Sequence, residues 1–239
     1  MGIIMCMRII GISLVKNEDI YIRKAIENVI EFCDELIILD NNSTDGTWDI
    51  LTELANKYDK IDLQRWENSA NSGKVLQKYI GKPYWIFAVD GDEIYDKEGL
   101  RLFKRDILSG MYDEYFKVVG NCLHCDKNED PFFRGYFARS ICKLFNFTNL
   151  KKWKQRERLH GGVPVLNEGF KRTVYGFQKN IKWEDSVFRC LHMCFVKRSS
   201  KQKDDGHRPA PKGHDENYKL KKYCNDNPQT LKVDFYDSR

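Results

Sequence analysis

Hydrophobic residues in the first part of the chain follow two patterns, unbroken apolar runs and runs spaced as on one face of a helix. Segments of strand length, mostly apolar and β-branched or aromatic, are residues 8–15, 35–39, 61–66 and 84–89. Segments with helical spacing are residues 19–32, 48–55 and 72–80. Strands that alternate with helices predict an α/β fold with a mostly parallel central sheet flanked by helices.

The pattern changes after about residue 110, where basic and aromatic residues interrupt the apolar runs. Candidate strands in this part are residues 114–122, 140–147 and 188–196. No linker rich in Pro, Gly or Ser separates the two parts, so we expect one domain over residues 1–198. Its halves would be about 7–110 and about 111–198, and the polar, basic residues 199–239 would be a loosely attached C-terminal tail.

Polar clusters follow three of the expected strands directly. They are Lys16-Asn17-Glu18, Asp40-Asn41-Asn42 and Asp90-Gly91-Asp92. Because ligands of parallel sheets bind beyond the carboxyl ends of the strands, we expect a binding site where these clusters meet.

Two of these clusters carry carboxylates suited to a ligand. Asp90 and Asp92 can both turn toward a hard divalent cation, and Gly91 permits a close backbone approach. A metal held there could neutralise a diphosphate, although a β-turn with acidic caps is the alternative. Asp40 stands at a strand end, where it could accept hydrogen bonds from a base or ribose, while one of residues 43–45 caps the next helix.

Composition narrows the classes of function. With 41% hydrophobic residues and a mean hydropathy of -0.60, the chain of 239 residues is not a membrane-embedded protein. Most of the net charge of +5 lies in residues 197–239, which excludes a strongly basic nucleic-acid-binding domain. That basic tail is either solvated or makes a peripheral membrane contact. The eight cysteines form no regular framework, which favours reduced thiols and a cytoplasmic protein.

The motifs SLVKNE, ELIILDNNSTDGT and WIFAVDGDE, in this order, resemble the nucleotide-sugar half of family 2-type glycosyltransferases with the GT-A fold. The resemblance covers about residues 7–96. It implies a GT-A (Rossmann-like) domain that moves a sugar from a nucleoside diphosphate sugar, expected to be UDP-linked, to a hydroxyl acceptor. The acceptor would be a glycan, lipid or protein, and the transfer would invert the anomeric centre with the help of a metal.

The resemblance also implies roles for individual residues. Those that it places at the donor nucleotide are Val15, Asn17, Glu18, Asp40, Asn42, Lys74 and Asp90. The expected ligands of Mn²⁺ or Mg²⁺ are Asp92, Asp90 and His192. For His192 the alternative is a strand histidine bonded to backbone.

Inverting transfer requires a carboxylate that deprotonates the acceptor hydroxyl. Glu184 and Asp185 stand beside Trp183 and resemble the Glu-Asp element of some relatives, and Asp185 is the preferred base. An ordinary loop is the alternative. Several relatives carry Glu after the histidine that corresponds to His160, where this chain has Gly, so Glu157 is the other candidate.

Three further interpretations stay open. A sugar-phosphate nucleotidyltransferase is disfavoured because no Gly-rich loop follows the first strand. A non-catalytic module that binds a nucleotide sugar or a glycan would retain the donor residues without a base. A zinc site is an alternative for one side of a strand with Cys190, His192 and Cys194, joined by Cys122, His124 and Cys125, although small buried cysteines are the simpler account.

Overall fold

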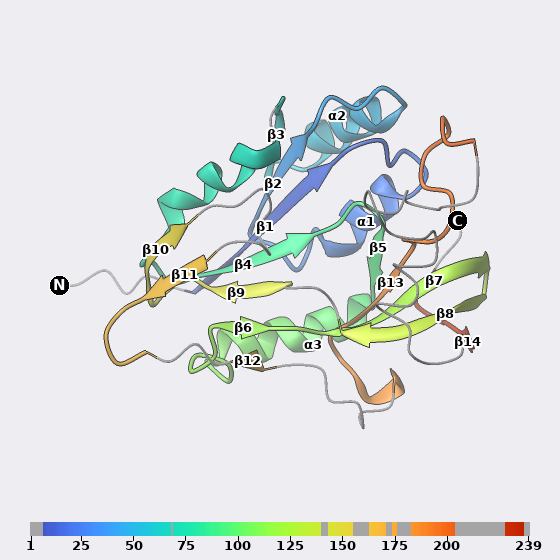
Figure 1. The fold of residues 1–239 in the computed structure, drawn as a ribbon. Helices are drawn as coiled ribbons and strands as arrows, with labels where there is room; N and C mark the ends of the chain where they lie inside the picture. Colours follow the sequence, from blue (N-terminus) through green and yellow to red (C-terminus); the bar gives the residue numbers. More distant parts are fainter. Residues whose placement is uncertain are drawn as a thin grey trace, which may run out of the picture.

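The computed structural model describes residues 7–67, 69–139, 143–154, 163–170, 174–175, 183–203 and 228–236. Glu157 and His160 lie outside these residues. A seven-stranded sheet with the order β12-β6-β9-β4-β1-β2-β3 forms the centre (Figure 1). Its strands are β1 (Arg8–Val15), β2 (Glu35–Asp40), β3 (Ile61–Arg65), β4 (Tyr84–Val89), β6 (Lys117–Val118), β9 (Leu144–Asn146) and β12 (Val174–Tyr175).

The four strands β4, β1, β2 and β3 are parallel, and β9 runs antiparallel to both of its neighbours. The strand β1 lies between β2 and β4, so nearly all of its side chains are buried. At Gly11 the packing leaves no room for a side chain, because a Cβ there would come within 2.5 Å of Leu36 Cδ1. The predicted fold class, an α/β domain with a mostly parallel central sheet flanked by helices, is confirmed.

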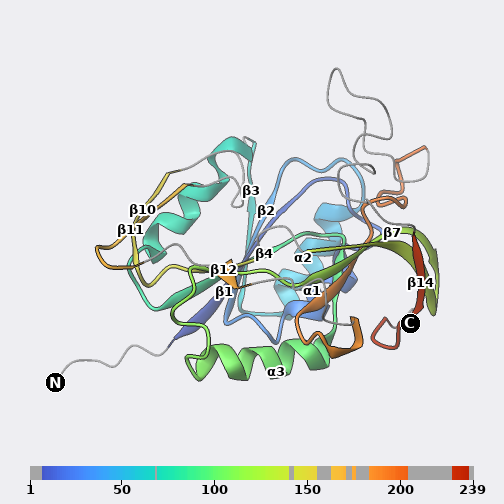
Figure 2. The same ribbon diagram turned by 60° about the horizontal axis from the view of Figure 1, so that its bottom comes forward.

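Helices cover one face of this sheet, and a 3-10 helix with a hairpin covers the other (Figure 2). The first group is α1 (Ile22–Val29), α2 (Thr47–Lys57) and α3 (Lys97–Leu108). The second is η1 (Ser69–Tyr79), β10 (Leu150–Lys154) and β11 (Val163–Leu166). The strands β1, β2 and β4 therefore bury alternate side chains in two separate cores, which explains why their sequences are almost entirely apolar.

Two helices begin differently from what the sequence pattern predicts. At α2 the N-cap position is Gly46, and the Asp45 carboxylate accepts a hydrogen bond from Thr47 N–H at 3.0 Å. The helix α3 was not expected, although Asp96 caps it by accepting from Gly99 N–H and its apolar residues have helical spacing.

A second sheet of five strands begins where the Asp90-Gly91-Asp92 turn ends. Its order is β14 (Gln229–Lys232), β8 (Phe132–Arg139), β7 (Asn121–Glu129), β13 (Arg189–His192) and β5 (Glu93–Tyr95). The strand expected over residues 114–122 is wrong in its bounds, because residues 117–118 belong to the central sheet and a new strand starts at Asn121. The charged half of β7 lies in an exposed hairpin with β8 and therefore lacks the apolar pattern.

The C-terminal part differs from the loosely attached tail that its polarity suggests. The strand β14 pairs with β8, and Val233 is buried with 2% exposure. Residues 199–203 lie against the loop after β1, where Ser200 N–H donates to Asp19 Oδ1 at 2.7 Å. Pairing with β14 covers the outer edge of β8, which is a physical reason for the chain to return there. Within the described residues, no helix is long and apolar enough to cross a membrane.

Candidate active site

The loops after β1 and β2 are joined to each other at the carboxyl edge of the sheet. Asn17 and Asn42 adopt left-handed backbone conformations with φ of 55° and 52°, which asparagine tolerates better than most residues. Asn17 N–H donates to Ser43 Oγ at 3.0 Å, and Asn17 Oδ1 accepts from Thr44 N–H at 2.8 Å. Both asparagines therefore shape the edge, and their predicted contacts with a nucleotide stay predictions.

Asp40 ends β2 opposite Val15 of β1, and it is fully buried. Its carboxylate accepts a hydrogen bond from Ser43 N–H at 3.1 Å and lies 3.7 Å from Arg65 Nε. The guanidinium of Arg65 in turn stacks on the Trp48 ring at 4.0 Å. Asp40 thus holds the loop that follows it, and its role toward a base or ribose stays a prediction.

The Asp90-Gly91-Asp92 turn packs tightly against the loop after β1. A Cβ on Gly91 would come 2.8 Å from both Glu18 Oε2 and Ile22 Cδ1, so only glycine fits without movement of these side chains. The backbone at Gly91 was expected to approach a ligand closely, and here it approaches the side chains of the protein's own loop after β1. This packing places Glu18 beside Asp92.

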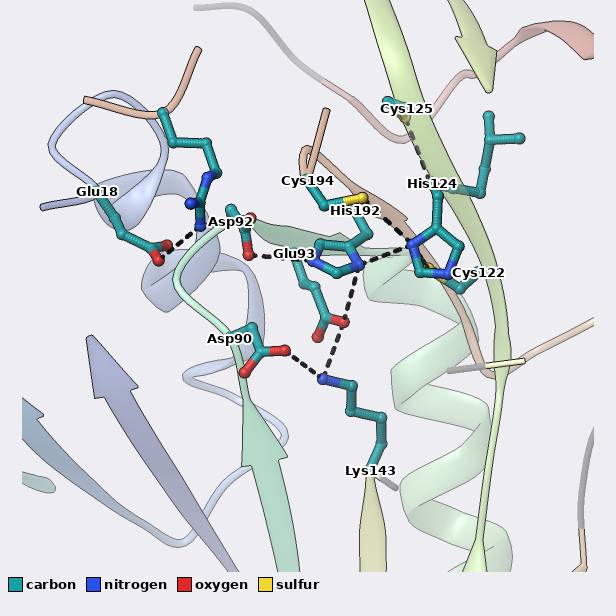
Figure 3. A network of polar contacts seen from close by, with 12 residues as sticks. Glu18, Asp90, Asp92, Glu93, Cys122, His124, Cys125, Lys143, His192 and Cys194 are labelled. Carbon is teal, nitrogen blue, oxygen red and sulfur yellow. Dashed lines mark hydrogen bonds and ion pairs between the residues drawn. The ribbon is translucent and has the colours of Figure 1, made fainter. Parts of the chain in front are cut away.

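Lys143 neutralises two carboxylates of this turn from a buried position. Its Nζ lies 2.8 Å from Asp90 Oδ2 and 2.9 Å from Glu93 Oε1 (Figure 3). Burial lowers the pKa of Lys143, but the charges of the two carboxylates outweigh it and the pKa is raised. Desolvation raises the pKa of Asp90, yet the charge of Lys143 brings it below the ordinary value. The Asp90 side chain keeps 47% of its surface exposed, so a ligand arriving from solvent would meet it first.

Arg198 supplies a second cation, which the sequence interpretation had counted only as part of the basic tail. Its Nη1 lies 3.0 Å from Glu18 Oε1 and 3.1 Å from Asp92 Oδ2. No local pattern around Arg198 indicates this contact, because its carboxylate partners lie more than a hundred residues earlier in the chain.

His192 stands next to the same turn. The antiparallel pairing of β13 with β5 sets it opposite Glu93, and its Nε2 lies 3.4 Å from Asp92 Oδ1 (Figure 3). The structure thus brings together Asp90, Asp92 and His192, the three predicted metal ligands. The four carboxylates of Glu18, Asp90, Asp92 and Glu93 outnumber the cations Lys143 and Arg198, and such a group of carboxylate oxygens suits a divalent cation.

Three predicted site residues lie elsewhere. Lys74 is exposed along η1. Glu184 and Asp185 are exposed in η3 (Trp183–Asp185), which precedes the first residue of β13, whereas His192 is its last. Within the described residues, neither carboxylate forms an ion pair with the metal-ligand candidates. Glu184 and Asp185 thus lie before the start of β13, at the end away from His192, and the prediction that one of them is the catalytic base stays a prediction.

Comparison with models of protein families shows to which family the chain belongs. The family model described as glycosyl transferase family 2 matches residues 12–200. The chain belongs to this family. The match includes the strands of both sheets apart from β14 and the first residues of β1, and it ends within the segment that carries Arg198.

Individual relatives in the family have different named activities. The chain is 27% identical to the lipopolysaccharide core biosynthesis glycosyltransferase LpsC of Rhizobium meliloti over 164 residues, 66% of this chain and 57% of the relative. It is 42% identical to a β-monoglucosyldiacylglycerol synthase of Nostoc sp. over 165 residues, 63% of this chain and 32% of that relative. These alignments therefore span less than two thirds of the length of either relative.

Solved glycosyltransferases are also similar to the chain. A crystal structure of S. aureus TarS (residues 1–349) in complex with UDP has a TM-score of 0.35 and 21% identity, covering 52% of this chain and 37% of that one. The mannosyltransferase PcManGT of Pyrobaculum calidifontis, in complex with GDP-Man and Mn²⁺, has a TM-score of 0.37 and 16% identity, covering 60% of this chain and 45% of that one.

Proposed function

We propose that this protein transfers a sugar from a nucleoside diphosphate sugar to a hydroxyl acceptor, with inversion and with the help of a divalent cation. The observation that carries the proposal is the group of carboxylates at the carboxyl edge of the parallel sheet, in a chain of glycosyl transferase family 2. UDP is the proposed nucleotide, as the sequence motifs implied. The named activities of the relatives, a lipopolysaccharide core biosynthesis glycosyltransferase and a β-monoglucosyldiacylglycerol synthase, favour a glycan or lipid acceptor.

Mg²⁺ or Mn²⁺ is the proposed cation, and Asp90 and Asp92 would hold it, with His192 Nε2 as a third ligand. The residues fit such an ion, since carboxylate oxygens are its preferred ligands and the site has an excess of negative charge. When bound, the ion would supply positive charge that stabilises the leaving diphosphate.

The remaining steps belong to the protein's own side chains. The loops after β1 and β2 would orient the nucleotide through Asp40 and Asn17, and buried Lys143 keeps Asp90 ionised. Arg198 would lie beside the diphosphate and add a charge-assisted hydrogen bond. A carboxylate must take the acceptor proton as the new glycosidic bond forms and the bond to the diphosphate breaks. The candidates for this base are Asp185, Glu184 and Glu157, and the position of the first two before the start of β13, away from His192, favours Glu157.

Donor binding and turnover test the proposal together. We expect one nucleotide sugar, in the presence of Mn²⁺, to raise the melting temperature of the protein by mass action, and Asp92→Asn to abolish this shift. Asp59→Asn is the matched control, because Asp59 is an exposed aspartate in the turn before β3. Release of nucleoside diphosphate only after acceptor is added would distinguish an enzyme from a binding module. A folded Asp92→Asn protein that retains metal-dependent binding would contradict the proposed site.

A further inference from the structure

A buried cluster of sulfur and nitrogen atoms lies directly behind the carboxylates. The parallel pairing of β13 with β7 sets Cys190 opposite Cys122 and His192 opposite His124. Cys194 follows β13 and reaches the same point (Figure 3). Exposure is 0% for Cys122, 3% for His124, 8% for His192 and 6% for Cys194.

Three of these groups converge on a single atom, His124 Nδ1. His192 Nδ1 lies 2.9 Å from it, Cys194 Sγ lies 3.4 Å from it and Cys122 Sγ lies 3.9 Å from it. One imidazole nitrogen takes part in one hydrogen bond in the plane of its ring, so hydrogen bonding accounts for only one of the three approaches.

The three distances match the edges of a metal coordination tetrahedron. With Zn–N bonds of about 2.0 Å and Zn–S bonds of about 2.3 Å, a tetrahedral zinc sets two nitrogens about 3.3 Å apart and a nitrogen and a sulfur about 3.5 Å apart. Each observed separation from His124 Nδ1 lies within about 0.4 Å of these values. Cys122, His124 and His192 offer ligand atoms that lie within 4.8 Å of one another, and Cys194 Sγ approaches this group through its contact with His124 Nδ1.

Charge and surroundings suit a soft divalent ion. Two thiolates and two neutral imidazoles would exactly balance Zn²⁺, so the filled site would bury no net charge. The other nitrogen of His192, Nε2, faces Asp92 Oδ1 at 3.4 Å. A carboxylate that orients the histidine ring from the side opposite the metal is usual for zinc-bound histidine.

We propose that Cys122, His124, His192 and Cys194 form a structural site for Zn²⁺ or a similar thiophilic cation, separate from the carboxylate site. The site would join β7 to β13 and to the segment after it, and so fix the position of His192 and Asp92. If His192 binds zinc through Nδ1, its Nε2 carries a proton and donates to Asp92. Zinc binding therefore replaces the role of His192 Nε2 as third ligand of the proposed Mg²⁺ or Mn²⁺, which Asp90 and Asp92 would then hold without a histidine.

Metal analysis of the untagged full chain tests this proposal. We expect about one zinc per chain after dialysis, and at least a tenfold lower content in the Cys122→Ser/Cys194→Ser double variant. Cys33→Ser is the matched control, because Cys33 is also a buried free thiol but lies in the core beside Gly11. Asp92→Asn should keep its zinc, which separates this site from the proposed donor site.

Spectroscopy of the wild-type protein tests the proposal even if the variants fail to fold. After exchange of the bound ion for Co²⁺, we expect a thiolate-to-cobalt charge-transfer band and the intense visible bands of tetrahedral coordination. X-ray absorption at the zinc edge should show two sulfur and two nitrogen neighbours. A folded wild-type protein that binds neither ion, or that binds zinc with oxygen neighbours only, would overturn the proposal.

Discussion

At the scale of single residues, Asp92 is shared between protein cations and the proposed metal. Arg198 Nη1 lies 3.1 Å from one of its oxygens, and His192 Nε2 lies 3.4 Å from the other. The Arg198 side chain is mostly buried, so solvent screens this pair less than a surface ion pair. A divalent cation must therefore compete with Arg198 or share the carboxylate with it.

Removal of Arg198 should favour the metal. We expect Arg198→Ala to bind Mn²⁺ about fivefold to tenfold more tightly in the absence of donor, since an ion pair of about 1 kcal/mol no longer opposes binding. Titration followed by the electron paramagnetic resonance of free Mn²⁺ would measure the change. Arg23→Ala serves as the control, because Arg23 pairs with Glu53 on an exposed helix face. Equal Mn²⁺ affinity in Arg198→Ala and wild type would argue against competition.

Lys143 makes a second residue-scale prediction, which concerns pH. Lys143→Met would leave Glu93 buried without its cation, at a cost of about 3 kcal/mol or more near neutral pH. The pKa of Asp90 is lowered in the folded protein, so its stabilising contribution is present above the unfolded value and is lost as pH falls through the folded value. The pKa of Glu93 is already raised by burial, so the variant gains relief when Glu93 takes up a proton.

Protonation of Asp90 and protonation of Glu93 both reduce the destabilisation that Lys143→Met causes. The difference in free energy of unfolding between wild type and Lys143→Met should therefore be largest near neutral pH. It should shrink first as the pH falls through the raised pKa of Glu93, and shrink further below about 3.8, the ordinary pKa of an aspartate, as Asp90 takes up a proton. Urea unfolding at several pH values measures it. A difference that stays constant with pH would mean that Lys143 acts through packing alone.

At the scale of elements, β13 lies between β5 and β7 in the second sheet and separates two groups of carboxylates. His192 at the end of β13 faces Asp92. Arg189 at the start of β13 pairs with Asp96 instead. The 3-10 helix η3 lies before this start, where Arg189 Nη1 donates to the Trp183 carbonyl oxygen at 2.7 Å. The Glu184 and Asp185 side chains belong to this opposite end.

This placement predicts a mild effect of Asp185→Asn. We expect transfer within about threefold of wild type and unchanged donor affinity, because general-base removal would instead cost on the order of 100-fold or more. Glu184→Gln is the neighbouring control, and Glu157→Gln is the variant expected to lose turnover. A large loss of rate with intact donor binding in Asp185→Asn would return the role of base to Asp185.

At the scale of the whole molecule, three distant parts of the chain meet around one turn. The parallel sheet delivers Asp90 and Asp92, the second sheet delivers His192, and the segment after β13 returns Arg198 to the loop after β1. The final strand β14 closes the outer edge of the second sheet. The second sheet and the C-terminal segment thus complete a site that the first ninety or so residues only begin.

The sequence by itself determined the parallel sheet and its polar edge. Apolar runs and helical spacing are local signals, and the carboxyl ends of parallel strands necessarily share an edge, so the strands β1, β2 and β4 and the cluster at Asp90 and Asp92 were predictable. The helix α3 had a comparable local signal, in its Asp96 cap and apolar spacing, and was overlooked.

Only the tertiary structure decided which side chains complete the site. Lys143 meets Asp90 across 53 positions of sequence, Cys194 meets His124 across 70 and Arg198 meets Asp92 across 106. Such contacts leave no periodic trace in the chain, because they depend on how β9 pairs with β4 and on how β13 pairs with both β5 and β7. The pairing of β13 carries Glu184 and Asp185 away from the donor edge, although their sequence alone resembled a catalytic element.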